Sequence, residues 1–457
     1  MGDYQVNFGQ GLTFGSGLAA RKSAFVMNVR RSYLPIRPFR SLNENEFMRG
    51  AAITLAKEKW QVVLFGSGKY ISTNFNANDT LQGDDIFSSV SLTGLHRTES
   101  EVSKRQNVFQ TIYGGNARWL LKNGHVGLTH VQTNYNMAFL PGDKPYQLYN
   151  FRGTDLRNTG IDYNLQWRNF NFFGEGSRSS NNAYALSSGM LISLDANLDV
   201  VILYRNFAKD YQTTFANPFA ENSDTRNEQG IYTGASLRIT RKWLLNAYLD
   251  FYQSKWLRYL VDGPSRGFDF LTELQYIPSR TAQLSFRYRQ EIKGRNQSNN
   301  TEPVDYISSQ TRSVYRFNAQ YKLGLNLSAK SRLEVVTFSD DIHKNQTGTL
   351  LFQDVNMSLP RKKVSLILRM AYFTVDDYNA RVYAAENEVL YQYAVPLYQN
   401  SGVRYYAVAR VKVNRKLELW FKYSQTRYSN VSTISSGLEQ INGNTLTDLR
   451  MQFRLLL

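Results

Sequence analysis

Basic residues recur at every second position in several stretches of this sequence. Arg287 and Arg289 form one such pair, and Lys330 and Arg332 form another. Because successive side chains of a β-strand point to opposite faces, residues two apart share a face. The alternate positions around the first pair carry aromatic side chains, as at Phe286. The spacing therefore predicts strands with one basic and one apolar face, and a closed interior lined by such basic faces would attract anions.

Placing the apolar positions outward assigns a larger set of cations to the interior. Our candidates for contact with an anion or with DNA are Arg238, Arg287, Arg289, Arg316, Lys330, Arg332, Arg369, Arg404 and Arg410. Acidic residues assigned to the same face, such as Glu273 and Glu334, are fewer. The alternative interpretation is that most of these cations pair with the acids in a ladder that rigidifies the wall.

Residues for catalysis or metal binding are sparse. The chain has no cysteine, which excludes a disulfide framework and thiolate chemistry. His125 and His130 fall on opposite faces of a predicted strand, which is the wrong arrangement for a chelate. Nucleophile-elbow, zinc-protease and P-loop motifs are absent from the sequence. We expect no enzyme, no metal and no cofactor, with an outer-membrane hydrolase kept as a minor alternative.

The stretch Gly230–Trp256 shows the strand pattern most clearly. Every second residue from Ile231 to Ile239 is apolar or small, and the alternation restarts at Trp243 after a polar turn. Each strand is about ten residues long, which exceeds the usual five or six of a globular sheet and matches the length that crosses a bilayer. Aromatic residues near both ends of the apolar face fit the girdles of a membrane barrel. The residues expected to face lipid are Ile231, Leu237, Trp243, Leu245, Phe286, Leu366 and Phe421.

The same hairpin pattern continues through most of the chain. Short turns, such as those expected at Arg168-Asn169 and at 360–362, alternate with long polar connections such as 209–229 and 424–444. Outer-membrane barrels have this asymmetry, with short periplasmic turns and long extracellular loops. The 457 residues have a mean hydropathy of −0.44. No apolar run of about 18 residues occurs, so no transmembrane helix is expected. The sequence predicts an all-β fold: a single closed antiparallel transmembrane barrel of about twenty strands that occupies residues 1–457 as one domain. A large soluble β-sandwich or propeller is the alternative.

Three segments interrupt the pattern. A short amphipathic helix is predicted near 100–112, with Ser100 as its cap and Gly114 as its stop. Residues 33–47, which contain two prolines, could fold into the lumen or reach out as a loop. Residues 381–400 could form a strand pair or a folded loop.

Three stretches together resemble a known family: GDYQVNFGQGLTFGSGLAARKS at 2–23, GLHRTESEVSKRQ at 94–106, and LWFKYSQTRYSNVSTISSGLEQINGNTLTDLRMQFRLLL at 419–457. They are similar to the C-terminal barrel part of Gram-negative outer-membrane proteins whose N-terminal part carries helix-hairpin-helix DNA-binding repeats. This sequence shows neither such repeats nor a signal peptide, so we expect it to be the barrel portion of a longer, processed protein. The resemblance implies an outer-membrane location and, by analogy, DNA as a partner.

These patterns lead to one main hypothesis about function. The chain has a net charge of +17, and we expect an outer-membrane pore with a basic lumen, embedded in lipid, that conducts anionic material such as DNA. The first alternative is a barrel that transports nothing and anchors a periplasmic or surface protein partner. The hydrolase is the second.

Overall fold

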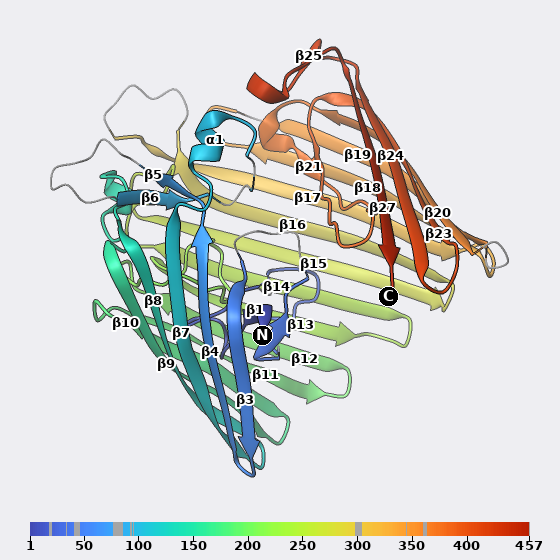
Figure 1. Cartoon of the computed structure of the whole chain (residues 1–457). Helices are drawn as coiled ribbons and strands as arrows, with labels where there is room; N and C mark the ends of the chain where they lie inside the picture. The colour runs from blue at the N-terminus through green and yellow to red at the C-terminus, as the bar shows by residue number, and fades with distance from the viewer. Residues whose placement is uncertain are drawn as a thin grey trace. The chain divides into compact units, whose positions relative to one another are not determined.

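The computed structural model describes residues 1–17, 21–32, 34–40, 46–75, 86–91, 94, 96–297, 304–343, 345–359 and 363–456. The regular elements of these residues are almost all β-strands, with one short α-helix and a few 3₁₀ turns (Figure 1). No helix in this described part is long and apolar enough to cross a membrane. The chain forms two compact units: the first comprises Met1–Ser236, Tyr248–Phe268 and Gly294–Ile307, and the second comprises Leu237–Ala247, Asp269–Lys293 and Ser308–Leu457.

The first unit contains a run of antiparallel strands, each paired with the next. In chain order they are β3 (Met48–Lys57), β4 (Trp60–Ile71), β7 (Val108–Leu121), β8 (Gly124–Phe139), β9 (Gly153–Trp167), β10 (Phe170–Ser179), β11 (Tyr184–Asp195) and β12 (Leu198–Phe207). In β4, buried Val63 and Phe65 alternate with exposed Leu64. This period of two confirms the hairpins predicted from the sequence.

The N-terminal segment packs against the buried face of these strands. Strand β1 (Gly2–Val6) pairs with both β2 (Ile36–Pro38) and β3, and the described residues between β1 and β2 form no helix or long strand. Phe8 and Phe14 share a core cluster with Val63 and Phe65 of β4. The described part of residues 33–47 therefore folds back with β1, whereas residues 33 and 41–45 lie outside the described residues. Two further short strands, β5 (Thr73–Phe75) and β6 (Ile86–Val90), pair with each other.

The second unit repeats the antiparallel pattern, in yellow to red in Figure 1. Its paired strands are β17 (Ile307–Lys322), β18 (Leu327–Ser339), β19 (Gln346–Leu359), β20 (Val364–Val375), β23 (Ser401–Lys412), β24 (Leu417–Tyr428) and β27 (Thr445–Leu455). The strands between the two runs are β13 (Glu228–Arg238), β14 (Trp243–Ser254), β15 (Ser265–Ser279) and β16 (Ala282–Asn296). The turn predicted at residues 360–362 lies outside the described residues.

The connection between β20 and β23 is a folded loop rather than a pair of wall strands, which decides between the two alternatives for residues 381–400. It contains η3 (Tyr378–Ala380) and a ladder of two residue pairs between β21 (Val382–Tyr383) and β22 (Leu397–Tyr398). Its apolar residues Val382, Ala384 and Tyr398 are buried in a core cluster with Phe352 of β19. The remaining short elements are η1 (Pro145–Gln147), β25 (Thr433–Ile434), η4 (Gly437–Glu439) and β26 (Ile441–Asn442).

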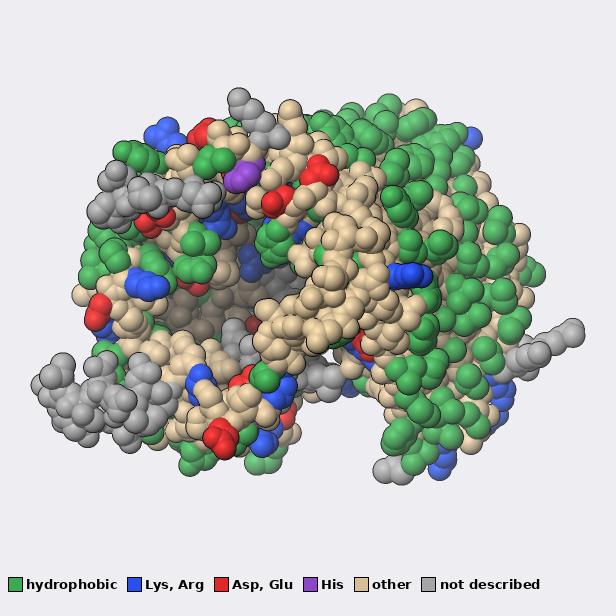
Figure 2. All heavy atoms as spheres, turned by 90° about the horizontal axis from the view of Figure 1, so that it is seen from above, with side chains coloured by type: hydrophobic (Ala, Val, Ile, Leu, Met, Phe, Trp, Pro, Cys, Tyr) green, Lys and Arg blue, Asp and Glu red, His purple; other side chains and the backbone are tan. Residues whose placement is uncertain are grey.

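One face of the long strands exposes large apolar side chains. Ile231, Trp243, Phe286 and Phe421, all predicted to face lipid, have exposed side chains. The other predicted lipid-facing residues, Leu237, Leu245 and Leu366, are half-buried. Figure 2 shows such hydrophobic side chains gathered over a broad outer area. An apolar face this extensive is unusual on a protein surrounded by water.

The helix prediction near 100–112 is wrong in its extent and its cap. Helix α1 spans only Glu99–Ser103, with Thr98 as N-cap, and Val108–Ile112 belong to strand β7. The spacing of Val102, Phe109 and Ile112 would place them on one face of a helix. In the structure β7 pairs with β4, and Phe109 and Ile112, three residues apart, lie on opposite faces of that strand.

Candidate functional site

The strands from β15 to β18 bring five of the predicted cations together on one polar face of the second unit. We call these cations and their acids the β15–β18 cluster: Arg287, Arg289, Arg316, Lys330, Arg332, Asp269, Glu273 and Glu334. Three of the arginines hold an acid on a neighbouring strand. The Nε of Arg287 donates to Glu273 at 2.6 Å. Arg289 binds both oxygens of Asp269, at 2.9 and 2.7 Å.

Arg332 has no acid at hydrogen-bonding distance, because Arg316 occupies the nearest one, Glu334. Arg316 binds both oxygens of Glu334, at 2.7 and 2.8 Å. Arg332 donates instead to the amide oxygen of Asn318 at 2.8 Å, and its nearest Glu334 oxygen is 3.7 Å away. The Arg332 side chain is 13% exposed. Its charge is therefore only partly neutralised on this face.

Lys330 has a similar position on the same strand. It lies opposite Asp354 in the pairing of β18 with β19. Both oxygens of Asp354 already accept hydrogen bonds from Arg369, at 2.5 and 2.7 Å. Since Arg369 takes the best geometry at this carboxylate, Lys330 adds to the surplus of positive charge.

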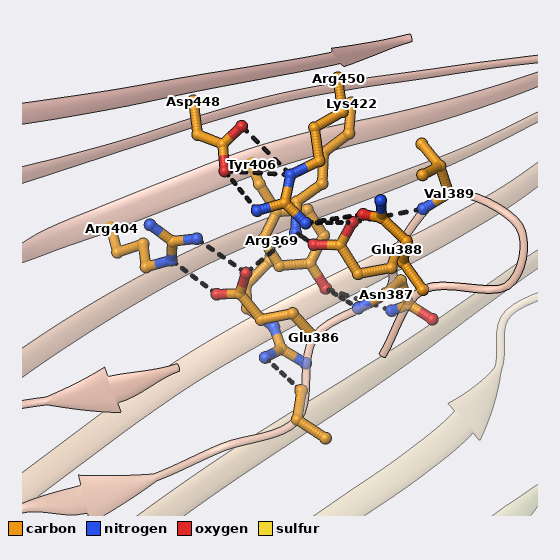
Figure 3. A network of polar contacts seen from close by, with 12 residues as sticks. Arg369, Glu386, Asn387, Glu388, Val389, Arg404, Tyr406, Lys422, Asp448 and Arg450 are labelled. Carbon is orange, nitrogen blue, oxygen red and sulfur yellow. Dashed lines mark hydrogen bonds and ion pairs between the residues drawn. The ribbon is translucent and has the colours of Figure 1, made fainter. Parts of the chain in front are cut away.

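A second group, the loop-binding cluster, lies where the 376–400 loop meets strands β19 to β27 (Figure 3). It consists of Asp354, Arg369, Arg404, Lys422, Asp448 and Arg450 on the strands and Glu386 and Glu388 on the loop. Arg404 binds both oxygens of Glu386, at 2.6 and 2.8 Å. The strand cations therefore hold the loop by its carboxylates.

Two predicted candidates lie apart from both clusters. Arg238 is exposed at the last residue of β13. Arg410 binds Glu418, at 3.1 and 3.0 Å, and lies over the ring of Trp420. Arg454 reaches the same Glu418 at 2.9 Å. Most of the candidates are therefore paired with acids, as the ladder interpretation expects. These are Arg287, Arg289, Arg316, Arg369, Arg404 and Arg410.

Strand periodicity did not find the loop acids. Glu386 and Glu388 are two residues apart in a connection with no regular pattern, so no face could be assigned to them. Arg312 was also missed; its guanidinium donates to the backbone oxygen of Arg381 at 2.9 Å and so fixes the start of the same loop. The only sequence signal was an acidic pair inside an aromatic-rich loop.

The first unit uses a buried acid to hold its N-terminal segment. The carboxylate of Glu175 accepts hydrogen bonds from the backbone N–H groups of Gln10, Leu12 and Thr13, at 2.6, 3.0 and 2.7 Å. Fully buried Arg205 binds Asp250, which also holds Lys22 of the N-terminal segment at 2.9 Å. These contacts can fix a segment in place, but they offer no reactive group to a substrate.

The described histidines and acids form separate contacts and not a metal site. Among them, no three His, Cys, Asp or Glu side chains could hold one metal ion. His125 contacts Asp162 at 3.1 Å, and Asp162 also lies 3.4 Å from Asn116. His130 contacts the hydroxyl of Thr159 instead. The two histidines thus have separate partners and do not combine in one site.

Comparison with known proteins gives loose structural matches only. No family model and no curated protein matches the chain. The outer membrane channel DcaP of Acinetobacter baumannii is 13% identical with a TM-score of 0.35, over 81% of this chain and 98% of that one. The anion-selective porin from Comamonas acidovorans is 10% identical with a TM-score of 0.36, over 76% and 99% of the two chains. The FpvAI–pyocin S2 complex is 11% identical with a TM-score of 0.45, over 90% and 65%. Likenesses of this strength transfer no function, ligand or partner to this chain.

Proposed function

We propose that the chain forms the wall of an outer-membrane β-barrel, one domain over residues 1–457, that conducts small anionic solutes. The long strands run for 10 to 16 residues, as in β3 and β8. Such strands are long enough to cross a bilayer. Their exposed apolar faces would meet lipid, and their polar faces would line the lumen.

The observation that carries the proposal is the surplus of cations in the β15–β18 cluster. Five basic side chains there share three acids, and the two that lack a close acid partner are Lys330 and Arg332. A partly desolvated cation attracts a small anion more strongly than a cation in bulk water does. Arg332 and Lys330 would therefore set the charge preference of the path.

This proposal predicts a loss of anion preference when the surplus is removed. In planar bilayers the protein should pass chloride in preference to potassium, and Lys330→Gln with Arg332→Gln should lower that ratio about threefold or more, since both charges face the path. The matched control is Lys122→Gln with Lys242→Gln, which removes two charges in exposed turns. Cation preference in the native protein, or an equal effect of the control pair, would contradict it.

A non-transporting anchor is the second candidate, and a specific observation favours it. The N-terminal segment and the 376–400 loop are both packed against the buried faces of the strands in their own units. Material packed this way could close a lumen. Conductance distinguishes the two functions: an anchor should show no steps above the leak in bilayers, whereas a channel should.

The DNA interpretation stays a prediction, because it depends on the family resemblance rather than on the clusters above. Binding through lumenal cations would weaken steeply with salt and ignore base sequence, since a strand wall offers no reading element for a major groove. If the protein did not bind DNA at low salt, the DNA interpretation would be wrong and the small-anion proposal would be unaffected.

A further inference from the structure

The 376–400 loop is bound to the strands as an anionic ligand would be. The carboxylate of Glu386 is held by Arg404 and by Lys422, whose Nζ is 3.1 Å away. The carboxylate of Glu388 contacts Lys422 and lies 3.2 Å from Arg450. Lys422 thus bridges two adjacent carboxylate positions, as Figure 3 shows.

These contacts are almost completely withdrawn from water. The side chains of Glu386, Glu388 and Lys422 are 0%, 2% and 2% exposed. Opposite charges buried together stabilise one another, but a buried charge that loses its partner is costly. The strand cations therefore require anions at these two positions whenever water cannot enter.

The charge balance shows which anions fill that need. The strands contribute four cations and two acids to the loop-binding cluster; Asp354 binds Arg369 and Asp448 binds Arg450. Glu386 and Glu388 supply the two remaining negative charges. If both left, Arg404 and Lys422 would have no acid among the members of this cluster.

The rest of the loop is attached by the core packing of Val382, Ala384 and Tyr398 and by few polar contacts. Arg369 donates to the backbone oxygen of Ala385 at 2.8 Å, and the N–H of Asn387 donates to the Tyr406 hydroxyl at 3.2 Å. Only two residue pairs form the ladder between β21 and β22. A competing anion would therefore displace carboxylates from a short irregular segment, not from a sheet.

We propose that Arg404, Lys422 and Arg450 form a binding site for solutes with two adjacent carboxylate or phosphate groups, and that Glu386 and Glu388 occupy this site in the resting protein. The inference deepens the proposed anion pathway and rests on it for the access of solutes to this face. Arg404 presents a fork for one anionic group, and Lys422 with Arg450 holds the second. A monovalent anion would fill only half of the site.

The absence of cysteine from the chain allows a direct test. Ala384 is 1% exposed within the loop, so Ala384→Cys places a single thiol where a reagent can reach it only when the loop lifts. Pyrophosphate should raise the labelling rate of this cysteine at least tenfold, whereas acetate at equal ionic strength should not. Val389→Cys, at a position 4% exposed, is a second reporter if the first variant folds poorly.

Removing the loop carboxylates should release the loop, as pyrophosphate does, and so speed the labelling of the cysteine. Glu386→Gln with Glu388→Gln should label about tenfold faster without pyrophosphate and should bind pyrophosphate more tightly in calorimetry. Glu58→Gln with Glu99→Gln removes two exposed carboxylates and should change neither result. Labelling that responds to neither pyrophosphate nor the loop substitutions, or that responds equally to acetate, would overturn the site. Labelling reports no current, so a protein without anion conductance that still responds to pyrophosphate would refute the channel and keep this site.

Discussion

Arg369 shows how the polar face of the second unit accommodates buried charge. Its guanidinium binds both oxygens of Asp354, donates to the Ala385 carbonyl, and lies 3.8 Å from the centroid of the Phe352 ring. Bidentate pairing and ring stacking satisfy arginine in a way that lysine cannot reproduce. With the guanidinium engaged on every side, we assign Arg369 to the wall and not to solute binding.

Alternation predicted which cations share a face of the sheet, but it did not predict which of them lack a close acid partner. Arg316 lies opposite Glu334 and Arg332 lies opposite Asn318, whereas Lys330 lies opposite Asp354, which Arg369 already binds. Register is set by how each hairpin turn closes, and a one-residue slip would change every partner. The surplus at Arg332 could therefore not be found from the sequence.

The attachment of the loop should depend on pH through Glu386. Burial alone would raise the pKa of Glu386, but Arg404 and Lys422 outweigh it and hold the pKa below the ordinary value of 4.5. A lowered pKa in the folded state adds stability that is fully present above 4.5 and is lost as pH falls through the folded value. We expect hydrogen exchange of residues 381–398, corrected for its intrinsic rate, to be constant from about pH 7 to 5 and to rise below 4.5.

The variant Glu386→Gln provides the control for this pH effect. It cannot titrate at this position, so its exchange should already be raised at neutral pH, and any remaining step below 4.5 should be smaller than in the native protein. Loosening of the native loop between about pH 7 and 5 would contradict the lowered pKa of Glu386.

At the scale of elements, the two-residue alternation of apolar side chains predicted the hairpins well. It predicted poorly the irregular segments that pack against the strands. Strands such as β9 and β10 meet at the predicted turn of Arg168 and Asn169. By contrast, the glycine-rich residues after β1 carry neither strand nor helix spacing, and their place is set by tertiary contacts such as those to Glu175. Irregular segments that fold against a wall leave no period in the sequence.

The N-terminal segment should be sensitive to a single added methyl group at Gly11. Gly11 has a φ of +78°, and a Cβ there would lie 1.8 Å from Nη1 of buried Arg31. We expect Gly11→Ala to destabilise the segment by about 1–3 kcal/mol, because a side chain strains this backbone conformation and displaces Arg31. Faster proteolysis within residues 1–17 would report the loss.

Gly66→Ala is the matched control for this substitution. A Cβ at Gly66 on strand β4 would have no heavy atom within 4 Å, and its φ is not in the left-handed range. Proteolysis of residues 1–17 should therefore be unchanged in this variant. Equal cleavage of the two variants would show that the packing around Gly11 does not hold the N-terminal segment.

For the whole molecule, the two faces of the strands matter more than its composition. A mean hydropathy of −0.44 and a net charge of +17 would suit a water-soluble basic protein. The structure instead separates the chemistry by face: Leu449, Met451 and Phe453 of β27 are exposed, whereas Arg450 and Arg454 bind acids on the other side. Hydropathy averaged over both faces hides this separation.

Neighbouring residues on β27 offer a test of the membrane assignment. Met451 is 74% exposed opposite Phe421. Gln452 lies opposite Trp420, which is 6% exposed. In a bilayer, Met451→Arg would place a charge in hydrocarbon near the middle of the strand, at a cost of roughly 2–4 kcal/mol in the free energy of unfolding. Gln452→Arg, on the polar face beside Glu418 and its partner Arg454, should cost less than about 1 kcal/mol.

Urea titration of each variant folded into lipid vesicles measures both values, and the same pair in a lipid-free buffer gives the reference. If Met451→Arg were as stable as Gln452→Arg in vesicles, or if the native protein stayed monomeric and folded without detergent or lipid, the apolar face would not be a membrane surface and the channel proposal would fail with it.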